Sequence, residues 1–544
     1  MNENEMLNCL QERAIEVKNK KLNSIENQNN YLIYENFYFD FSKQYIDKKI
    51  LALLLNFVKN RDIKRSISDL FSDKKINTTE NRSALHWLLR APSLSEVSNG
   101  LKPIHRNIID NVTSMSSLIK IIHDGAWLGV NNQVIDCIVN IGVGGSDLGP
   151  AMVISALKEF RPENSSHISI HFVATMDGTD LLELFKTIDP AKTLFVYASK
   201  SFSTLDTQSN ASTALEWMKS KFPGSAVSNI LEKHFIGITS KPDKAENWGI
   251  PTKHILTFDE SIGGRYSLWS TIGFSIAVAI GMENFNALLS GANSMDEHFQ
   301  NAPLETNLPL IMALVNFWNV RFLNFQSQLI LPYDGRLKLL PAYLQQLEME
   351  SNGKSVNHKG ELLKYNTSPI LWGDVGTKGQ HAFYQLLHQG THAVMCDFIV
   401  FADSEQQILT ADKSVQARFK YHKKINIANC LAQAELLAFG SNSAFKKFNL
   451  ESNPHKIYSG GKPSNMILIK ELTPYSLGQL VSLYEHKVFT LAALWDINPF
   501  DQWGVELGKK IADTTYLGLE DDNALCQELS DGTLRLMKQI NNFQ

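Results

Sequence analysis

Two series of short apolar runs alternate with helical patterns along the 544-residue chain, and this alternation constrains the fold more than any other feature. The first series consists of "DCIVNIGVGG", "ISIHFVATMDG", "TLFVYASKS", "HFIGITSKP" and "ILTF". Helical patterns such as residues 206–221 lie between these runs. Strands that alternate with helices are typical of parallel βαβ winding, so an α/β fold with doubly wound parallel sheets is expected.

A second series follows, made of "QLILPYDGR", "PILWGDVG", "VMCDFIVFADS" and "NMILIKEL", with a helical stretch over 409–438. Two successive α/β units fit this pattern better than one large sheet, and a chain of this length is expected to form at least two domains. The predicted organisation is a mostly helical N-terminal region (1–115, with an amphipathic helix at 48–60), a first α/β domain (116–290), a second (291–510) and a helical tail (511–544).

Composition narrows the class of protein. The chain carries 52 Lys and Arg against 56 Asp and Glu, so it has no overall basic charge that would favour nucleic acid. The first twenty residues lack the basic start and apolar run of a signal peptide, and the longest apolar stretch, 268–282, is short for a membrane span and predicts a buried helix. Five scattered cysteines without a CxxC pair favour neither a disulfide framework nor a thiolate metal site. A cytosolic, soluble protein is expected.

Ligands of doubly wound sheets bind beyond the carboxyl ends of the strands, which directs attention to the polar residues there. The run "NIGVGGSDLGP" (140–150) is a Gly-rich turn from a strand into a helix, and its backbone N–H groups suit a phosphate. A dinucleotide fingerprint G-x-G-x-x-G that starts at Gly142 would need a glycine at its sixth position, where Asp147 stands, so NAD binding is disfavoured. A plain tight turn is the alternative.

A second polar cluster, "YASKSFSTLDT" (197–207), follows another strand. It places four hydroxyls and one ammonium within six residues: Ser199, Lys200, Ser201, Ser203 and Thr204. If a helix begins near Asp206, the cluster forms a second anion cradle suited to a phosphomonoester. A cluster of Ser and Thr residues taken alone is more often a solvated loop. Because the Gly-rich loop lies in the same α/β unit, a phosphate site is favoured here.

The stretch "LPAYLQQLEMESNGK" (340–354) holds two carboxylates two positions apart, Glu348 and Glu350. Pro341 suits the first turn of a helix, and the Asn-Gly pair at 352–353 should end it. Residues two apart on a helix do not share a face, so only one of the two acids can act together with Gln346. Glu350 stands four residues after Gln346, and Glu348 points elsewhere; which of the two carboxylates does chemistry stays open at this point.

Two other stretches offer an arginine and a histidine. Arg265 in "GGRYS" could approach an oxyanion, although a surface arginine is the commoner outcome. In "GDVGTKGQHAFYQLLHQGTH" (373–392) a glycine-rich loop delivers Gln380 and His381 to the start of a helix. A metal site built from the three histidines is disfavoured because Gly390 and Thr391 weaken helix between His388 and His392, and a loop histidine acting as an acid or base is preferred.

The stretch "NPFDQWGVELGKK" (498–510) has a strong turn that should lead into a helix holding Gln502, Glu506, Lys509 and Lys510. A solvated i,i+4 pair between Glu506 and Lys510 would leave Lys509 on a different face.

Together, in order and spacing, these motifs resemble the glucose-6-phosphate isomerase (phosphoglucose isomerase) family, as does "INTTENRSALHWLLR" (76–90). The resemblance covers nearly the whole chain. It implies two sugar-isomerase (SIS) domains of the doubly wound type, a cytosolic homodimer and no metal or organic cofactor. It also implies reversible isomerisation of glucose 6-phosphate to fructose 6-phosphate, in glycolysis and gluconeogenesis, through ring opening and a cis-enediol(ate).

The resemblance also implies roles for individual residues. The family's base falls on Glu350, its ring-opening histidine on His381, its active-site lysine on Lys509, and the arginine near the enediolate on Arg265. Phosphate and sugar contacts fall on Ser146, Ser199, Ser201 and Thr204, with Gly145 and Lys200 beside them, and on Gln346 and Gln502. In family homodimers the histidine loop reaches into the partner's site. The chain departs from the family pattern at Ser201, Ser203, Leu205, Asp206, Val375 and Lys378, none of which removes a proposed catalytic group.

Three alternatives remain open at this stage. A non-catalytic phosphosugar-binding module would keep the phosphate loops but lack the base or the histidine, and both are present. A nicotinamide-dependent oxidoreductase is disfavoured by the failed fingerprint. An isomerase with additional mannose 6-phosphate activity is compatible with every motif.

Overall fold

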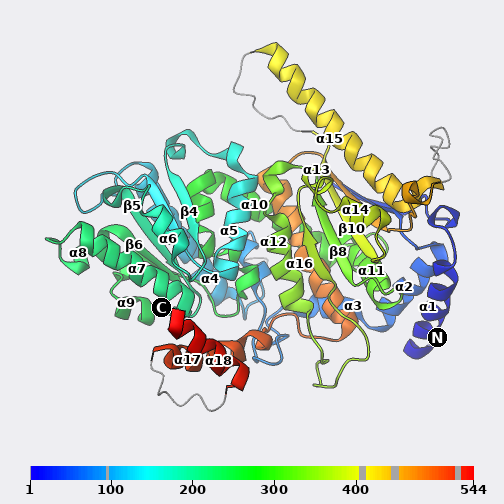
Figure 1. Ribbon diagram of the computed structural model, residues 1–544, viewed down its shortest axis with the longest axis horizontal. Helices are drawn as coiled ribbons and strands as arrows, with labels where there is room; N and C mark the ends of the chain where they lie inside the picture. The colour runs from blue at the N-terminus through cyan, green and yellow to red at the C-terminus, as the bar shows by residue number, and fades with distance from the viewer. Residues whose placement is uncertain (1, 94–96, 404–411, 443–452, 521–528, 544) are drawn as a thin grey trace. The chain divides into compact units, whose positions relative to one another are not determined.

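The computed structural model describes residues 2–93, 97–403, 412–442, 453–520 and 529–543 (Figure 1). It divides into two compact units, Met1–Pro499 and Phe500–Gln544. The larger unit contains two separate β-sheets, so the expectation of two α/β units rather than one large sheet is confirmed. The smaller unit begins at Phe500, whereas the sequence places the start of the tail at 511.

The first sheet is entirely parallel and has the strand order β4-β3-β5-β6-β7. Its strands are β3 (Cys137–Ile141), β4 (Ser169–Val173), β5 (Thr193–Ala198), β6 (Phe235–Thr239) and β7 (Ile255–Thr257), and each coincides with an apolar run of the first series. Every residue of β3, β5 and β6 is buried. Helices cover both faces of such a sheet, which explains why these strands are mostly apolar along their length rather than alternating.

The second sheet has the order β1-β2-β11-β10-β8-β9. Strands β8 (Ser327–Pro332), β9 (Ile370–Gly373), β10 (Val394–Phe401) and β11 (Ser464–Ile469) are parallel and match the second series of apolar runs. Strands β1 (Tyr31–Tyr34) and β2 (Phe37–Lys43) form a hairpin that adds to β11 in antiparallel fashion.

This hairpin corrects one expectation, because the first 115 residues were predicted to be mostly helical with few strand signals. Within "YLIYENFYFDFSK", the buried aromatic residues Phe37, Phe39 and Phe41 of β2 alternate with partly buried residues. Glu35, in the turn, has a φ of 47°. An aromatic period-two pattern around a short polar turn is a hairpin signal. The hairpin therefore belongs to the second sheet although it lies far from it in sequence.

Helices occupy most of the remaining chain. They are α1 (Glu3–Lys18), α2 (Lys48–Asn60), α3 (Ile63–Leu70), α4 (Lys102–His123), α5 (Leu148–Ala156), α6 (Thr179–Leu184), α7 (Leu205–Lys221), α8 (Val227–His234), α9 (Pro242–Trp248), α10 (Phe274–Asn301), α11 (Leu308–Arg321), α12 (Leu340–Gln345), α13 (Gly376–Gly379), α14 (Tyr384–Gln389), α15 (Lys413–Phe439), α16 (Pro474–Trp495), α17 (Glu506–Glu520) and α18 (Asp531–Phe543). The helices expected at 48–60 and 206–221 are confirmed. Residues 409–411 of the expected helix 409–438 lie outside the described residues, and α15 accounts for the rest.

Helices α10 and α16 pack against each other along their lengths, and Figure 1 shows them side by side between the two sheets. By length and composition alone, Thr271–Asn301 could cross a membrane, but 67% of its apolar window is buried inside the fold, as predicted for this stretch. Gly281 interrupts α10 with a φ of 79°. The predicted domain boundary at 290/291 falls inside α10, and the four predicted domain ranges stay predictions.

Candidate active site

The two predicted phosphate loops follow neighbouring strands. Strands β3 and β5 pair in parallel, with Ile141 opposite Tyr197, so the segments after them emerge at the same edge of the sheet. The first segment makes a tight turn at Gly144–Ser146 and then enters α5. The Ser146 hydroxyl makes no hydrogen bond with the described residues, so it can donate to a ligand. The first loop therefore combines a helix N-terminus with an available hydroxyl, as expected for an anion site.

The second loop leads into α7, which begins at Leu205 as predicted. The hydroxyls of Ser199 and Thr204 lie 3.2 Å apart and face each other across the loop. Thr204 is the N-cap of α7 but makes no side-chain capping bond, which leaves first-turn N–H groups free for an anion. Phe202 anchors the loop by stacking on Tyr197 with ring centroids 3.9 Å apart. Ser201 is exposed.

Lys200 lies differently from the phosphate-side position that the resemblance suggests. Its ammonium donates to the carbonyl oxygens of Glu260 and Ile262, each at 2.8 Å. Burial lowers the pKa of Lys200 to about 8. The side chain thus holds the segment that immediately precedes Gly263 and Arg265, and it connects the second loop to the arginine.

Arg265 is buried, which excludes the alternative of a surface arginine for "GGRYS". Its Nε donates to Ser351 Oγ at 2.7 Å, its Nη2 donates to the carbonyl of Pro499 at 2.6 Å, and its Nη1 lies 3.6 Å from Glu350 Oε1. The preceding Gly264 packs directly on the first loop, because a Cβ on Gly145 would lie only 1.9 Å from the Gly264 carbonyl oxygen. Arg265 is therefore fixed between the phosphate loops and the helix that carries Glu350.

The stretch 340–354 is helical from Leu340 to Asn352, as predicted, but Gln346–Glu350 form a turn of π-helix rather than α-helix. Glu348 and Glu350 point away from each other, as expected for residues two apart. Glu348 is buried and pairs with Lys487 at 2.9 Å, whereas the Glu350 side chain is 24% exposed and faces Arg265. A π-turn in a helix is rare and occurs often at functional sites.

Five side-chain oxygens of this helix are buried without a hydrogen-bond partner among the described residues, and two of them belong to Gln346 and Glu350. Glu350 Oε2 and Gln346 Oε1 are buried and make no hydrogen bond with the described residues. Gln346 reaches the first loop, since a Cβ on Gly144 would lie 2.9 Å from Gln346 Nε2. Unpaired buried acceptors are costly, and they are expected where a ligand supplies the missing donors. Two hydroxyls of a sugar would satisfy both atoms.

His381 lies in the turn between α13 and α14, and its neighbour Gln380 donates to Tyr333 Oη at 3.2 Å. The His381 side chain is exposed and makes no hydrogen bond or ion pair with the described residues. Helix α14 ends at Gln389, as the glycine at 390 predicts, and His388 Nε2 is 2.7 Å from Gln433 Oε1. No group of three or more potential metal ligands occurs among the described residues.

Lys509 and Gln502 belong to the smaller compact unit. Lys509 is exposed and pairs with Glu506 at 2.8 Å, so Glu506 pairs with Lys509 rather than in the solvated i,i+4 pair with Lys510 that was the alternative. Residues three apart on a helix can form an ion pair as readily as residues four apart, and Lys509 is three residues after Glu506. Helix α17 begins at Glu506, and Gln502 precedes it rather than lying on it.

Three residues of the cluster were not identified from the sequence. Ser351 Oγ accepts from Arg265 Nε and shares a 3.0 Å hydrogen bond with the Tyr266 hydroxyl, and burial raises the pKa of that tyrosine to about 12. Lys354 caps the helix by donating to the carbonyls of Glu350 and Ser351 at 3.0 and 2.7 Å. Tyr266, Ser351 and Lys354 lie in the same motifs as the predicted site residues. Their place in these motifs is the only feature of the sequence that could have indicated them.

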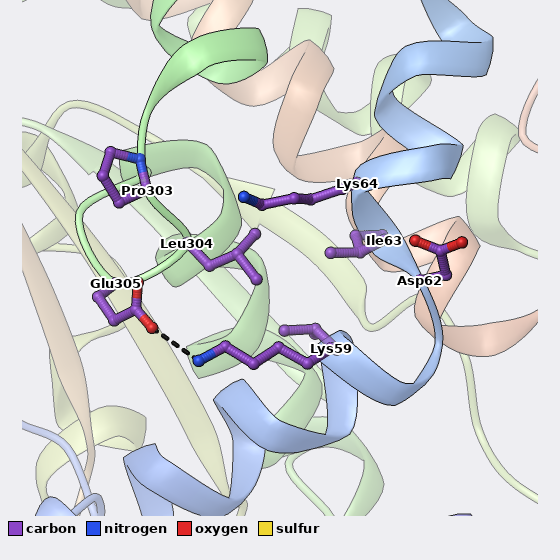
Figure 2. Close-up of a pocket in the computed structure, with 8 residues that line it drawn as sticks. Lys59, Asp62, Ile63, Lys64, Pro303, Leu304 and Glu305 are labelled. Carbon is purple, nitrogen blue, oxygen red and sulfur yellow. Dashed lines mark hydrogen bonds and ion pairs between the residues drawn. The ribbon is translucent and has the colours of Figure 1, made fainter.

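A surface pocket of about 340 Å³ lies elsewhere, between α2, α3 and the segment after α10 (Figure 2). Its cation Lys59 is paired with Glu305 at 2.9 Å. The pocket contains none of the predicted site residues; its lining is Val58, Lys59, Asp62, Ile63, Lys64, Pro303, Leu304 and Glu305.

Comparison with known proteins agrees with this geometry. A family model described as phosphoglucose isomerase matches residues 40–533. A glucose-6-phosphate isomerase of Acinetobacter baumannii (strain AB0057) is 46% identical over 519 residues, covering 94% of this chain and 92% of that protein. One of Acinetobacter venetianus is 46% identical over 508 residues, covering 92% and 90%. The crystal structure of a glucose-6-phosphate isomerase from Chlamydia trachomatis superposes with a TM-score of 0.82 at 29% identity, covering 99% of each chain.

Proposed function

This chain belongs to the phosphoglucose isomerase family and interconverts glucose 6-phosphate and fructose 6-phosphate, and we propose that Glu350 moves the proton between C1 and C2. The observation that carries this assignment is the meeting of Glu350 with a buried cation, Arg265, beside two loops suited to a phosphate. The hypotheses of a nicotinamide-dependent enzyme and of a non-catalytic sugar-binding module gain no support from the relatives, which are named as isomerases.

The phosphate of the substrate binds to the two loops after β3 and β5. Ser146, Ser199 and Thr204 supply hydroxyl donors, and the N-termini of α5 and α7 supply backbone N–H groups, which suit a dianion. Ser201 and the backbone at Gly145 and Lys200 line the same loops. Binding energy from this remote group holds C1 and C2 at the carboxylate.

Glu350 removes a proton from one carbon and returns it to the other. Because its Oε1 faces Arg265 and its Oε2 is unpaired, one oxygen is oriented while the other is available to the substrate. The enediolate that forms places negative charge on oxygen, and the fixed guanidinium of Arg265 stabilises that charge without having to reorganise. Gln346, whose amide lies toward the first loop, positions the sugar hydroxyls.

His381 opens the sugar ring as an acid, with Lys509 as a cationic helper and Gln502 contacting the sugar. We propose that His381 acts on the substrate held by a second copy of the chain. Its exposed side chain without a partner among the described residues supports this assignment. Helix α15 also supports a second copy of the chain, because a row of exposed apolar side chains suits a protein interface. These side chains have no covering element among the described residues; they are Val415, Phe419, Tyr421, Ile425 and Leu431.

The enzyme acts in the cytoplasm by this proposal. Cys137, Cys396 and Cys430 are free and buried, a use of cysteine that suits a reducing compartment.

A coupled assay tests the function directly. Fructose 6-phosphate is supplied, and formation of glucose 6-phosphate is followed in the presence of EDTA. The expected result is turnover that is insensitive to the chelator, because no step of the proposal requires a metal. The Glu350→Gln variant in the same assay reports background activity. Lack of turnover by the folded wild-type protein would refute the proposal, and activity that requires an added divalent ion would refute the metal-free chemistry.

A further inference from the structure

Glu348 and Lys487 form a buried ion pair directly behind the proposed catalytic carboxylate. Lys487 Nζ donates to Glu348 Oε2 at 2.9 Å, and the two side chains are 0% and 2% exposed. Glu348 precedes Glu350 by two residues in the π-turn, so its side chain points into the protein while that of Glu350 points toward Arg265. The ion pair therefore holds the opposite face of the same turn.

Lys487 in turn connects this turn to the centre of the second sheet. It lies on α16 and donates to Gln328 Oε1 at 3.2 Å. Gln328, on β8, donates to Asp397 Oδ2 on β10 at 2.8 Å. Both strands are internal to the sheet. Two hydrogen bonds, Glu348–Lys487 and Lys487–Gln328, thus connect Glu348 to an internal strand of the second sheet.

Asp397, at the far end of this network, has further hydrogen-bond partners. Asp397 accepts from Tyr484 Oη at 3.2 Å and from Asn465 Nδ2 at 2.8 Å. Gln44 donates to Asn465 at 2.9 Å and accepts from Asn319 at the same distance. Each of these side chains is buried and hydrogen-bonded, so the network fixes the position of Gln328, the second acceptor of Lys487.

A π-turn needs such external support. It is rarely adopted, and an ordinary α-helical turn of the same sequence would rotate Glu350 away from its place relative to Glu348. The residues around Glu350 hold the turn by specific contacts: Met349 Sδ accepts from Leu371 N at 3.4 Å, and Asn352 Nδ2 donates to the Val488 carbonyl at 3.1 Å. The charged pair is the strongest of these contacts, and charge-assisted hydrogen bonds are the most selective for geometry.

We propose that the Lys487–Glu348 ion pair is a positioning device that fixes the register of the π-turn and thereby aims Glu350 at the reacting carbons. This inference rests on the proposed role of Glu350 as the base. Burying an ion pair is a poor way to gain stability, because desolvation offsets the attraction, but it can specify one arrangement among several. Neither Glu348 nor Lys487 is expected to touch the substrate.

The test compares Glu348→Gln, Lys487→Met and the double variant E348Q/K487M in the full-length enzyme. For each variant we measure kcat, KM, the inhibition constant of inorganic phosphate and the thermal midpoint. Leu10→Ala is the control for lost stability alone, because Leu10 is a core residue of the N-terminal helix α1. Glu350→Gln is assayed in parallel, so that failure of the base assignment is distinguished from failure of the positioning role.

Each single variant is expected to lower kcat by about 10- to 100-fold while the phosphate inhibition constant changes by less than about two-fold. The single variants leave one buried charge unpaired and lower the thermal midpoint, and the double variant, which removes both charges, recovers much of that midpoint. Its kcat should nevertheless stay low, because neither charge is left to specify the register.

Two results would overturn the inference. One is a kcat close to the wild-type value in folded E348Q or in the double variant while Glu350→Gln is inactive. The other is a kcat that follows the thermal midpoint across all variants, Leu10→Ala included, since the pair would then serve stability alone. If Glu350→Gln itself kept full activity, the base assignment would fail, and the positioning role with it.

Discussion

Arg265 and Glu350 are held together by the residue that follows the glutamate. The guanidinium donates its Nε to Ser351 Oγ at 2.7 Å, and this bond places Nη1 3.6 Å from Glu350 Oε1. The separation is longer than a hydrogen bond, so the carboxylate is oriented by the cation without being committed to it. In the proposed mechanism the same arginine stabilises the enediolate oxygen when the proton moves.

The first prediction concerns the base. Glu350→Gln should lower kcat by about 10³-fold with KM changed by less than about three-fold, because the amide keeps size and polarity but cannot transfer the proton. Steady-state kinetics in both directions of the reaction measure this. Glu232→Gln, which alters an exposed glutamate paired with Lys253, is the control and should be silent. A Glu350→Gln enzyme with kcat within ten-fold of wild type would contradict the assignment.

The second prediction concerns the phosphate loops. Ser199→Ala and Thr204→Ala should each raise KM roughly ten-fold, the value of one hydrogen bond to a charged group. Because the two hydroxyls lie 3.2 Å apart and interact, the double variant should raise KM by less than the product of the single effects. Inorganic phosphate should compete with substrate, and unphosphorylated glucose should be turned over very poorly.

Ser203→Ala is the matched control for the second loop. Ser203 lies in the same cluster but is exposed, and no role follows from its position, so its KM should equal that of the wild type. Equal turnover of glucose and glucose 6-phosphate would argue against the proposed cradle.

The third prediction follows from the buried ammonium of Lys200. Burial lowers its pKa in the folded protein to about 8, from 10.5. Between these values the unfolded chain binds more protons than the folded one, so the contribution of Lys200 to the free energy of unfolding increases as pH rises through this window and is lost as pH falls toward 8.

Lys200→Met lacks this titration. The difference in thermal midpoint between wild type and variant should therefore shift in favour of the wild type between about pH 7 and about pH 9.5, corresponding to roughly 2 kcal/mol. Calorimetry at both pH values measures it. Lys253→Met, which removes an exposed ammonium, is the control and should show no comparable shift. A difference that does not depend on pH would mean that Lys200 is not held in a desolvated site.

The parallel strands could be predicted from the sequence because their apolar runs depend on burial alone. Each of β3, β5 and β6 is buried at every position and mostly apolar in sequence, and no tertiary information is needed to recognise such a run. The hairpin of β1 and β2 escaped prediction for the opposite reason. It lies among helices in the sequence, and its partner β11 is more than 400 residues away along the chain.

In the candidate site, too, the features set by local sequence could be predicted, and those set by distant contacts could not. That Glu348 and Glu350 point in different directions followed from spacing, since residues two apart do not share a helix face, whereas the choice of Glu350 as the base came from the family resemblance. The π-turn did not follow, because it is held by Lys487 on α16 and other distant contacts. The ammonium of Lys200 was placed beside the phosphate by resemblance, whereas carbonyl oxygens some 60 residues away determine its direction.

The fourth prediction concerns a site shared between two chains. If His381 acts on a sugar whose base belongs to the partner, His381→Ala and Glu350→Gln should each be nearly inactive as homodimers. In a mixed dimer, one site combines the intact glutamate of the first variant with the intact histidine of the second, and the other site lacks both.

Co-refolding the two inactive proteins, followed by isolation of mixed dimers with two different affinity tags, should therefore restore activity to about half the wild-type level per dimer, by the count of sites in a symmetric pair. If both groups came from one chain, every site of the mixed dimer would lack one of them, and mixing would restore nothing. Each variant refolded alone is the control and should stay inactive. Purified mixed dimers without activity would refute the shared site but leave the isomerase function intact, because Glu350 and Arg265 meet within one chain in either case.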